Sequence, residues 1–289
     1  EIINVTYPKQ VNVAINQIKN FNLQKQYYPA LIVPYITPAI FEMIKDSNTN
    51  TFDLNGNYYI NTPELLAIRL DKNNQYPEKR TIQNVFAGDS SIVCRYLLAY
   101  PKSYTKITEI YQGIESAGGK IVLSTVSKVL KILEEEMIIY KDKKRINLLQ
   151  PEKLLNLLRD NYEKPGIKDT LRIKIDTDNL PELLNQNFGV DNWIYSGTNS
   201  AFLYTTALKE KQCIIYTKKN IFDKISLQNY EDKRFYNCEI IETDSKFVFF
   251  NSEDYYASEI QAYLELSQLD KREKEIAQNI FNNIIWRVK

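Results

Sequence analysis

The chain has 289 residues, of which 44% are hydrophobic and 25% are charged, and its formal net charge is +1. This composition is typical of a soluble globular protein with two or three domains, and it excludes disordered, fibrous and globally basic, histone-like proteins. Histidine is absent. Its absence excludes Ser-His-Asp and Cys-His nucleophilic sites and every metal cluster that contains histidine.

The cysteines and the apolar runs exclude further classes of protein. Cys94, Cys213 and Cys238 are too few and too far apart in sequence for a disulfide framework or a C-x-x-C zinc half-site. The longest apolar runs, such as Ala30–Val33, are far shorter than the roughly 20 residues of a membrane helix. The first ten residues include polar and charged side chains and no long apolar run, unlike a signal peptide. We therefore expect a soluble cytoplasmic protein without a membrane partner, a cofactor or a metal.

The first segment, residues 1–80, opens with helix and strand patterns. Apolar residues recur at three- and four-residue steps over residues 7–26, which predicts an amphipathic helix. A strand is predicted at Ala30–Val33, because four apolar residues there precede a proline-bracketed turn. A second helix is predicted at Ala39–Lys45.

The same segment continues with a predicted hairpin and one more strand. Asn55 and Gly56 supply the two positive-φ residues that a tight turn requires, so Thr51–Asn61 is predicted to form a β-hairpin. The further strand, Leu65–Leu70, ends in a polar cluster with a proline and two asparagines, Asp71–Lys79. Such clusters are typical of connecting segments, and this one is the first predicted domain boundary.

The second segment, residues 81–165, is predicted to be largely helical. Short apolar helices are indicated at Ile92–Tyr100, where Pro101 follows, and at Ile107–Ile114. In a third helix, which starts near Leu123, apolar residues recur at i, i+3, i+4 and i+7, so one face is committed to a core. That face consists of Val126, Val129, Leu130 and Leu133.

An apolar, basic, apolar sequence follows the third helix and predicts a two-stranded hairpin with a positive tip. Its parts are Met137–Tyr140, Lys141–Arg145 and Ile146–Leu149. From Lys120 to Arg145 there are seven cations against four carboxylates, an excess of three in a chain whose net charge is only +1. The basic charge of the protein is therefore concentrated around the third helix and this hairpin.

Three helices followed by a basic hairpin are typical of a winged helix-turn-helix domain, whose third helix enters the major groove and whose wing reaches the backbone or the minor groove. Ser124 is placed to cap the third helix, where free N–H groups favour an anion. Winged helices also serve as protein–protein modules, and a lysine-rich hairpin is often a solvated turn, so both alternatives stay open. The predicted contacts to double-stranded DNA are Ser124, Thr125, Ser127, Lys128, Lys131, Lys143, Lys144 and Arg145.

The third segment, residues 166–289, follows a Pro-Gly linker and alternates strands with helices, which predicts a small α/β domain. Its last predicted helix is long, because apolar residues punctuate a charged sequence from Ile260 to Ile285. The other predicted elements are strands at Leu171–Ile175, Trp193–Tyr195, Ile214–Thr217, Ile240–Glu242 and Phe247–Phe250, and helices at Leu180–Asn187 and after Gly197 as far as Ala207.

Three weaker motifs are related to phosphate or metal chemistry. Gly197–Ser200 lacks the lysine of a P-loop and the three glycines of a dinucleotide fingerprint, so a helix-capping turn is the better interpretation. Asp176 and Asp178 are spaced like the carboxylates of a nucleotidyltransferase metal site, but they precede the glycine turn instead of following it. We take this pair as part of a solvated loop.

The third motif, Asp53 with Asp71 and Lys72, is similar to the carboxylates and lysine of metal-dependent nucleases. Such an enzyme needs the lysine two residues after the second carboxylate, whereas Lys72 directly follows Asp71. Asp53 is therefore better explained as a residue that flanks a turn. A magnesium-dependent nuclease that uses Asp53 and Asp71 remains the alternative function from a different class.

Short motifs along the whole chain, each weak by itself, occur in an order that resembles one family. They are Pro34–Pro38, Phe52–Asn57, Leu97–Pro101, Ser124–Leu130, Arg145–Leu149, Asn161-Tyr162, Gly197–Ala201, Ala262–Leu266 and Arg272–Ala277. In this order the chain resembles the AbiEi-like transcriptional regulators, the antitoxin component of type IV (abortive infection) toxin–antitoxin systems, and in particular their longer members with an extra N-terminal domain.

The resemblance implies a winged-helix DNA binder that represses its own operon and opposes a nucleotidyltransferase-like toxin. It also implies that the N-terminal domain has a restriction-endonuclease-like fold without its metal ligands. We thus predict an α+β or α/β multidomain protein without enzymatic activity. Its predicted domains are an N-terminal mixed α/β domain at 1–80, a central winged helix-turn-helix at 81–165 and a C-terminal α/β domain at 166–289. The sequence has no heptad seam sustained over several turns, so it does not predict the oligomeric state.

Overall fold

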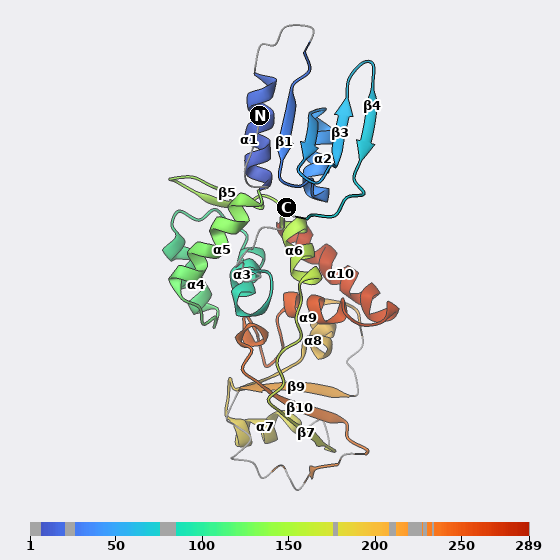
Figure 1. Cartoon of the computed structure of the whole chain (residues 1–289). Helices are drawn as coiled ribbons and strands as arrows, with labels where there is room; N and C mark the ends of the chain where they lie inside the picture. Colours follow the sequence, from blue (N-terminus) through green and yellow to red (C-terminus); the bar gives the residue numbers. More distant parts are fainter. Residues whose placement is uncertain are drawn as a thin grey trace. The chain divides into compact units, whose positions relative to one another are not determined.

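A computed structural model describes residues 7–20, 27–75, 85–175, 179–207, 212–218, 227, 230–232 and 234–288. These residues form a mixed α and β structure with three small sheets (Figure 1). The chain divides into two compact units, one of residues 1–83 with 131–139 and one of residues 84–130 with 140–289. The finer division into three sequence domains stays a prediction.

The first unit contains a four-stranded sheet with the strand order β1-β2-β3-β4. Strands β1 and β2 are parallel, and the other neighbours are antiparallel. Ile15 of helix α1 and Ile40 of helix α2 share one buried core with Leu31 and Val33 of β1. Both helices therefore cover the same face of the sheet. The elements are α1 Pro8–Lys19, β1 Ala30–Val33, α2 Pro38–Ser47, β2 Asn50–Asp53, β3 Tyr58–Asn61 and β4 Leu66–Arg69.

Local signals explain this unit, and most of its predicted elements are confirmed. The Thr37 side chain caps α2 by accepting the N–H of Ile40 at 3.3 Å. The hairpin is present, but its turn is longer than the predicted two-residue turn, and of the pair Asn55-Gly56 only Gly56 has a positive φ, +88°. The first helix ends at Lys19, and residues 21–26 of the predicted helix lie outside the described residues.

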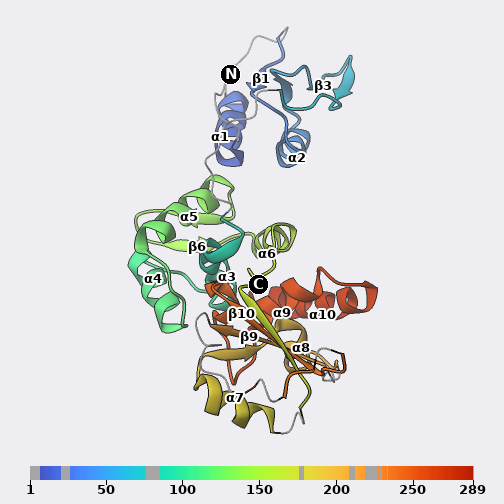
Figure 2. The same cartoon turned by 60° about the horizontal axis from the view of Figure 1, so that its bottom comes forward.

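The middle of the chain consists of four helices and a hairpin (Figure 2). Tyr104, between the first two helices, exchanges backbone hydrogen bonds of 3.0 and 2.7 Å with Ile146 and so adds a third short segment to the hairpin. Residues 131–139 belong to the first unit and the rest of this region to the second. The elements are α3 Ser91–Ala99, α4 Ile107–Ser116, α5 Leu123–Glu135, β5 Ile139–Lys141, β6 Ile146–Leu148 and α6 Pro151–Asp160.

The C-terminal part of the second unit is built on a sheet with the strand order β7-β10-β9-β8. Strands β9 and β10 are parallel, and the outer pairs are antiparallel. Helix α7 covers one face of this sheet, and α8 and α9 lie on the other (Figure 1). The elements are β7 Asp169–Ile173, α7 Leu180–Phe188, β8 Trp193–Tyr195, α8 Gly197–Tyr204, β9 Cys213–Lys218, β10 Cys238–Thr243, α9 Glu259–Leu266 and α10 Lys271–Val288.

Two predictions for this part are wrong. Phe247–Phe250 is not a strand, because Lys246–Phe249 forms a short 3-10 helix. The single long helix predicted from Ile260 to Ile285 is two helices, α9 and α10, separated by residues 267–270. The Ser267 hydroxyl donates to the carbonyl of Tyr263 at 2.6 Å just after the end of α9, and such back-bonding slightly destabilises helices and often bends them.

A buried polar network joins α3 to α9 inside the second unit. Arg95, only 2% exposed, donates from Nε to Ser91 Oγ at 3.1 Å and from Nη1 to Gln261 Oε1 at 2.7 Å. Gln261 Nε2 then donates to Glu265 Oε1 at 2.6 Å. Burial raises the pKa of the Glu265 carboxyl and lowers the pKa of Arg95 to about 10.

None of the helices in the described part of the chain combines the length and the apolar character that a membrane crossing requires. The three cysteines, Cys94, Cys213 and Cys238, are all buried and carry free thiols. The apolar spacing of the sequence thus accounts for most elements, while the two errors fall where aromatic or apolar residues continue across a break in regular structure.

Candidate nucleic-acid interface

Helix α5 has the two faces that its sequence predicts. The apolar residues at i, i+3, i+4 and i+7 are buried, since Val126, Val129, Leu130 and Leu133 are each at most 1% exposed. Burial of four aliphatic side chains stabilises the helix by about 1.5–3 kcal/mol for each side chain. The core therefore fixes which side chains α5 turns away from it.

After the exposed Leu123 at its start, the outward side chains of α5 are mainly polar and cationic. Ser124, Ser127, Lys128 and Lys131 are exposed, and Thr125 is partly exposed. Positions 124, 128 and 131 are four and three residues apart and therefore lie on one side of the helix. Lys131 Nζ is 3.9 Å from Glu135 Oε1, and its side chain is 74% exposed. This exposed pair is weak, so it leaves Lys131 available to another anion.

Helix α5 begins two residues earlier than the prediction that Ser124 caps it. The N–H groups of Thr125 and Val126 both donate to the carbonyl of Val122, at 2.9 and 3.2 Å. Val122 therefore occupies the cap position, and Ser124 lies inside the first turn. The prediction that Ser124 caps the helix is wrong, and its exposed hydroxyl is not committed to the backbone as a cap would be.

The turn between β5 and β6 is organised by Asp142. Its Oδ1 accepts the backbone N–H groups of Lys144 and Arg145, at 2.7 and 2.8 Å. Its Oδ2 accepts the Tyr140 hydroxyl at 3.0 Å. The N–H of Lys144, followed by that of Arg145, holds the pKa of the Asp142 carboxyl below its usual value. The carboxylate thus closes a turn that places Lys143 and Lys144 at the tip.

The three cations of the tip are not equally free. The Arg145 guanidinium lies over the Tyr140 ring, 5.3 Å from its centroid, and Arg145 Nε is 3.9 Å from Asp142 Oδ2. Lys143 and Lys144 are exposed. Arg145 is therefore pre-oriented by its neighbours, whereas the lysines project from the turn. Sequence reasoning missed Asp142 and Tyr140, although an Asp before a turn is a known local hydrogen-bond acceptor.

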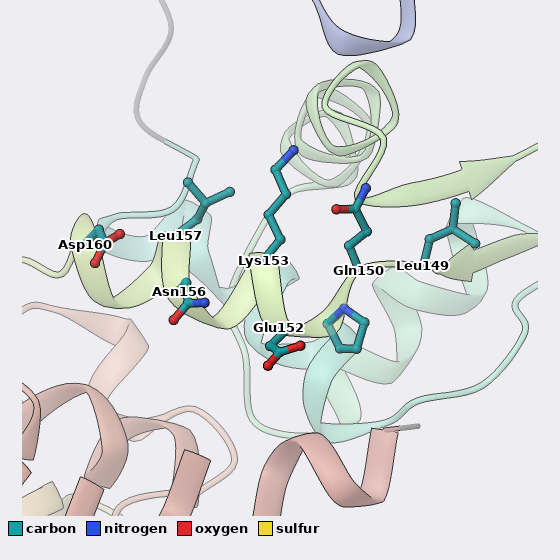
Figure 3. A pocket seen from close by; sticks show the side chains of 8 residues that line it. Leu149, Gln150, Glu152, Lys153, Asn156, Leu157 and Asp160 are labelled. Carbon is teal, nitrogen blue, oxygen red and sulfur yellow. The ribbon is translucent and has the colours of Figure 1, made fainter. Parts of the chain in front are cut away.

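A shallow hollow of about 640 Å³ lies along α6, just after the hairpin. Figure 3 shows Glu152 and Lys153 on different sides of this helix, with Asp160 near its end. The residues that line the hollow include one lysine and two carboxylates, so its net charge is negative. The hollow therefore has the wrong charge to extend a phosphate-binding surface.

A larger cavity of about 910 Å³ lies in the second unit between the loop after α4 and the C-terminal sheet. Three lysines line it, together with three aspartates. Burial, followed by the charge of Lys120, lowers the pKa of Lys218 in this cavity. Because its charges balance, the cavity has no net attraction for a polyanion. The lysines are Lys120, Lys218 and Lys246, and the aspartates are Asp191, Asp244 and Asp254.

The glycine motif at the start of α8 serves packing. Ser196 caps the helix by accepting the N–H of Asn199 at 3.4 Å, which confirms the prediction of a capping turn. A Cβ on Gly197 would lie 2.8 Å from the Cα of Ala262, so only glycine permits this approach of α8 to α9. The other phosphate-related pair, Asp176 and Asp178, lies outside the described residues.

The carboxylates of the nuclease alternative are engaged in the fold. Asp53, 8% exposed, accepts the N–H groups of Ile36, Asn55 and Asn57 and the side-chain amide of Asn57, at 2.8–3.1 Å. Asp71 pairs with Arg69 at 2.8 Å. Within the described ranges no group of three or more carboxylates or thiols is placed to hold a metal ion. Asp53 thus closes the β2–β3 turn, as the sequence predicted.

Comparisons with family models, with curated proteins and with solved structures found no match. In the structure the exposed side of α5 carries Ser124, Ser127, Lys128 and Lys131, and Lys143 to Arg145 are at the tip of the β5–β6 hairpin.

Proposed function

We propose that this chain is a non-enzymatic, sequence-specific DNA-binding regulator. In this proposal α3, α4 and α5 with the β5–β6 hairpin form a winged helix-turn-helix. Helix α5 lies in the major groove, and the hairpin contacts the backbone or the minor groove. The observation that carries the proposal is the outward side of α5, where exposed hydroxyl and ammonium groups stand above a fully buried apolar face.

The two groups of residues have different roles in recognition. Ser127 and Lys128 are exposed near the start of α5, where a recognition helix contacts base edges, and lysine can bond the guanine acceptors N7 and O6. Lys143 and Lys144 are on a turn, which suits contacts to phosphate that hold the register without reading sequence. The acidic end of α5, at Glu135, is a full helix length away from Ser124.

The environment of Asp53 supports a regulator rather than a nuclease. A metal-dependent nuclease needs carboxylate oxygens that are free to bind magnesium. The oxygens of Asp53 accept four N–H hydrogen bonds from the fold. Breaking these hydrogen bonds to bind magnesium would disrupt the β2–β3 turn. We therefore expect a labelled duplex that is incubated with the protein and Mg²⁺ to remain intact.

The role as an antitoxin rests on the resemblance to the AbiEi-like regulators. In this proposal the protein represses its own operon and opposes a nucleotidyltransferase-like toxin. Co-expression with the product of a neighbouring gene tests this part: growth arrest by that product alone, relieved by this chain, is the expected result. Arrest that persists would remove the antitoxin role and leave DNA binding to be judged separately.

The direct test is selection of binding sites from a random duplex pool, followed by affinity measurements on the selected and a scrambled site. Wild-type protein is expected to enrich a motif. Lys128→Ala should weaken binding to the selected site about tenfold, because one specific base contact is worth roughly 1–3 kcal/mol. Binding to the scrambled site should change much less.

Lys274→Ala is the matched control, since Lys274 is an exposed lysine on another helix, α10. It removes the same charge and should leave both affinities near the wild-type values. Failure of the wild type to enrich any motif, or equal effects of the two substitutions, would contradict the proposal.

A further inference from the structure

Strand β4 carries a row of apolar side chains at the edge of the first unit's sheet. It is the last strand in the order β1-β2-β3-β4, and among the described residues no strand pairs with its other side. Leu66 is 65% exposed, Ile68 50% and Leu70, just after the strand, 40%. Natural edge strands are usually protected by charge, proline or a cover, because an open edge is a template for another chain.

The backbone hydrogen bonds show which residues of β4 face outward. Thr62 and Leu65 bond each other through both N–H groups. Bonded and non-bonded pairs alternate along an antiparallel ladder, so in the observed register Ala67 and Arg69 point their backbone groups at β3. The N–H and C=O groups of Leu66, Ile68 and Leu70 therefore face away from the sheet.

The backbone hydrogen bonds of β3 agree with this alternation of inward- and outward-facing residues. The N–H of Asp53 donates to the carbonyl of Asn57 at 2.9 Å, and the N–H of Asn61 donates to Asn50 Oδ1 at 2.8 Å. The odd-numbered residues of β3 thus face β2. Tyr59, which lies opposite Ile68 in the register, is one of them, so Ile68 has no backbone bond to β3.

We propose that two copies of this chain associate through β4, antiparallel and edge to edge, about a two-fold axis that passes through Ile68. In this register Ile68 lies opposite Ile68 of the second copy, and Leu66 lies opposite Leu70 of the second copy. Every outward backbone group of the three residues is then bonded, and their side chains meet on the face that α1 and α2 cover. The inference does not rest on the proposed function.

This register is favoured because it pairs the three exposed apolar residues with one another, and the charges at its ends suit a second copy as the occupant. With Ile68 on the axis, Arg69 lies opposite Ala67, and the exposed Glu64 comes near Lys72 of the other copy. An axis at Arg69 would place two guanidinium groups against each other, which is destabilising. An axis at Ala67 would put Leu70 opposite Glu64, which lies in a turn, and leave the Leu70 backbone unpaired. An unrelated strand has no reason to match this pattern.

Sedimentation equilibrium of the full chain tests the proposal. Wild-type protein is expected at the mass of two chains. Ile68→Lys places a charge on the axis and should return the mass to one chain, with an unchanged circular dichroism spectrum because residue 68 is half exposed in the single chain. Leu203→Lys changes a similarly exposed residue of α8 and should remain dimeric.

A second experiment does not depend on a disruptive substitution. The native thiols are all buried, so Ile68→Cys introduces the reactive one, and a short bis-maleimide should link two copies rapidly. Leu203→Cys should link much more slowly. A wild-type protein at the mass of one chain, a dimer that Ile68→Lys leaves intact, or equal linking at both positions would each overturn the proposal.

Discussion

Single side chains fix the geometry of the hairpin tip, and Asp142 is the most important of them. It is an acid at the centre of a basic surface, so simple charge counting predicts that its removal improves DNA binding. Its carboxylate, however, accepts the N–H groups of Lys144 and Arg145 and the hydroxyl of Tyr140. These bonds hold the turn that presents Lys143 and Lys144.

We expect Asp142→Ala to weaken DNA binding several-fold, because the turn loses its acceptor and the lysines lose their placement. Asp142→Asn removes the charge but keeps an oxygen that can accept the same N–H groups, so it should bind at least as tightly as wild type. Fluorescence anisotropy on one duplex at one salt concentration gives both values. Tighter binding by Asp142→Ala would show that charge alone matters at the tip.

Spacing within the sequence was enough to predict the buried side of α5, because Val126, Val129, Leu130 and Leu133 repeat with the helical period. It was not enough for Asp142, whose role depends on the conformation of a turn. The start of α5 was misplaced for a related reason. A serine is a good cap in general, but here the carbonyl of Val122 receives the first helical bonds.

At the scale of elements, helix α9 is held by polar as well as apolar contacts. Gly197 allows α8 to approach it closely, and Gln261 connects it to Arg95 of α3. The carboxylate of Glu265, near the end of α9, reaches the start of α8 and accepts the N–H of Thr198 at 3.3 Å. Burial still dominates over these bonds and raises the pKa of Glu265.

This shift predicts a pH dependence of stability. A raised pKa means that the folded state holds a proton which the unfolded state has lost, so the free energy of unfolding falls as pH rises above the ordinary glutamate value of 4.5 towards the folded pKa. Glu265→Gln removes this titration and keeps an acceptor for Thr198. Urea unfolding from pH 4 upwards should show a smaller decline for Glu265→Gln than for wild type. Parallel curves for the two proteins would contradict this explanation.

Element boundaries were harder to predict than elements. The apolar period runs on both sides of the break between α9 and α10, and nothing in that period marks residues 267–270 as non-helical. Likewise Phe247 and Phe250 are buried, as in a central strand, yet the backbone between them is a 3-10 turn. In both cases tertiary packing overrides a local apolar pattern that suits more than one structure.

For the whole molecule, the central claim is that a chain with a net charge of +1 binds DNA through one local concentration of cations. The sequence showed this concentration, because it depends only on where lysines and arginines occur. It could not show how the chain divides into compact units, since residues 131–139 group with the N-terminal residues and not with their immediate neighbours.

The most direct test is the salt dependence of DNA affinity for a variant in which Lys143, Lys144 and Arg145 are all alanine. Its matched control replaces Lys271, Arg272 and Lys274, three exposed cations of α10, and so has the same net charge. Each lost phosphate contact reduces the slope of log K against log salt by about 0.9. The tip variant should therefore show a slope shallower by roughly 2 to 3, with the control unchanged. Equal slopes for wild type and the tip variant would contradict the proposed interface.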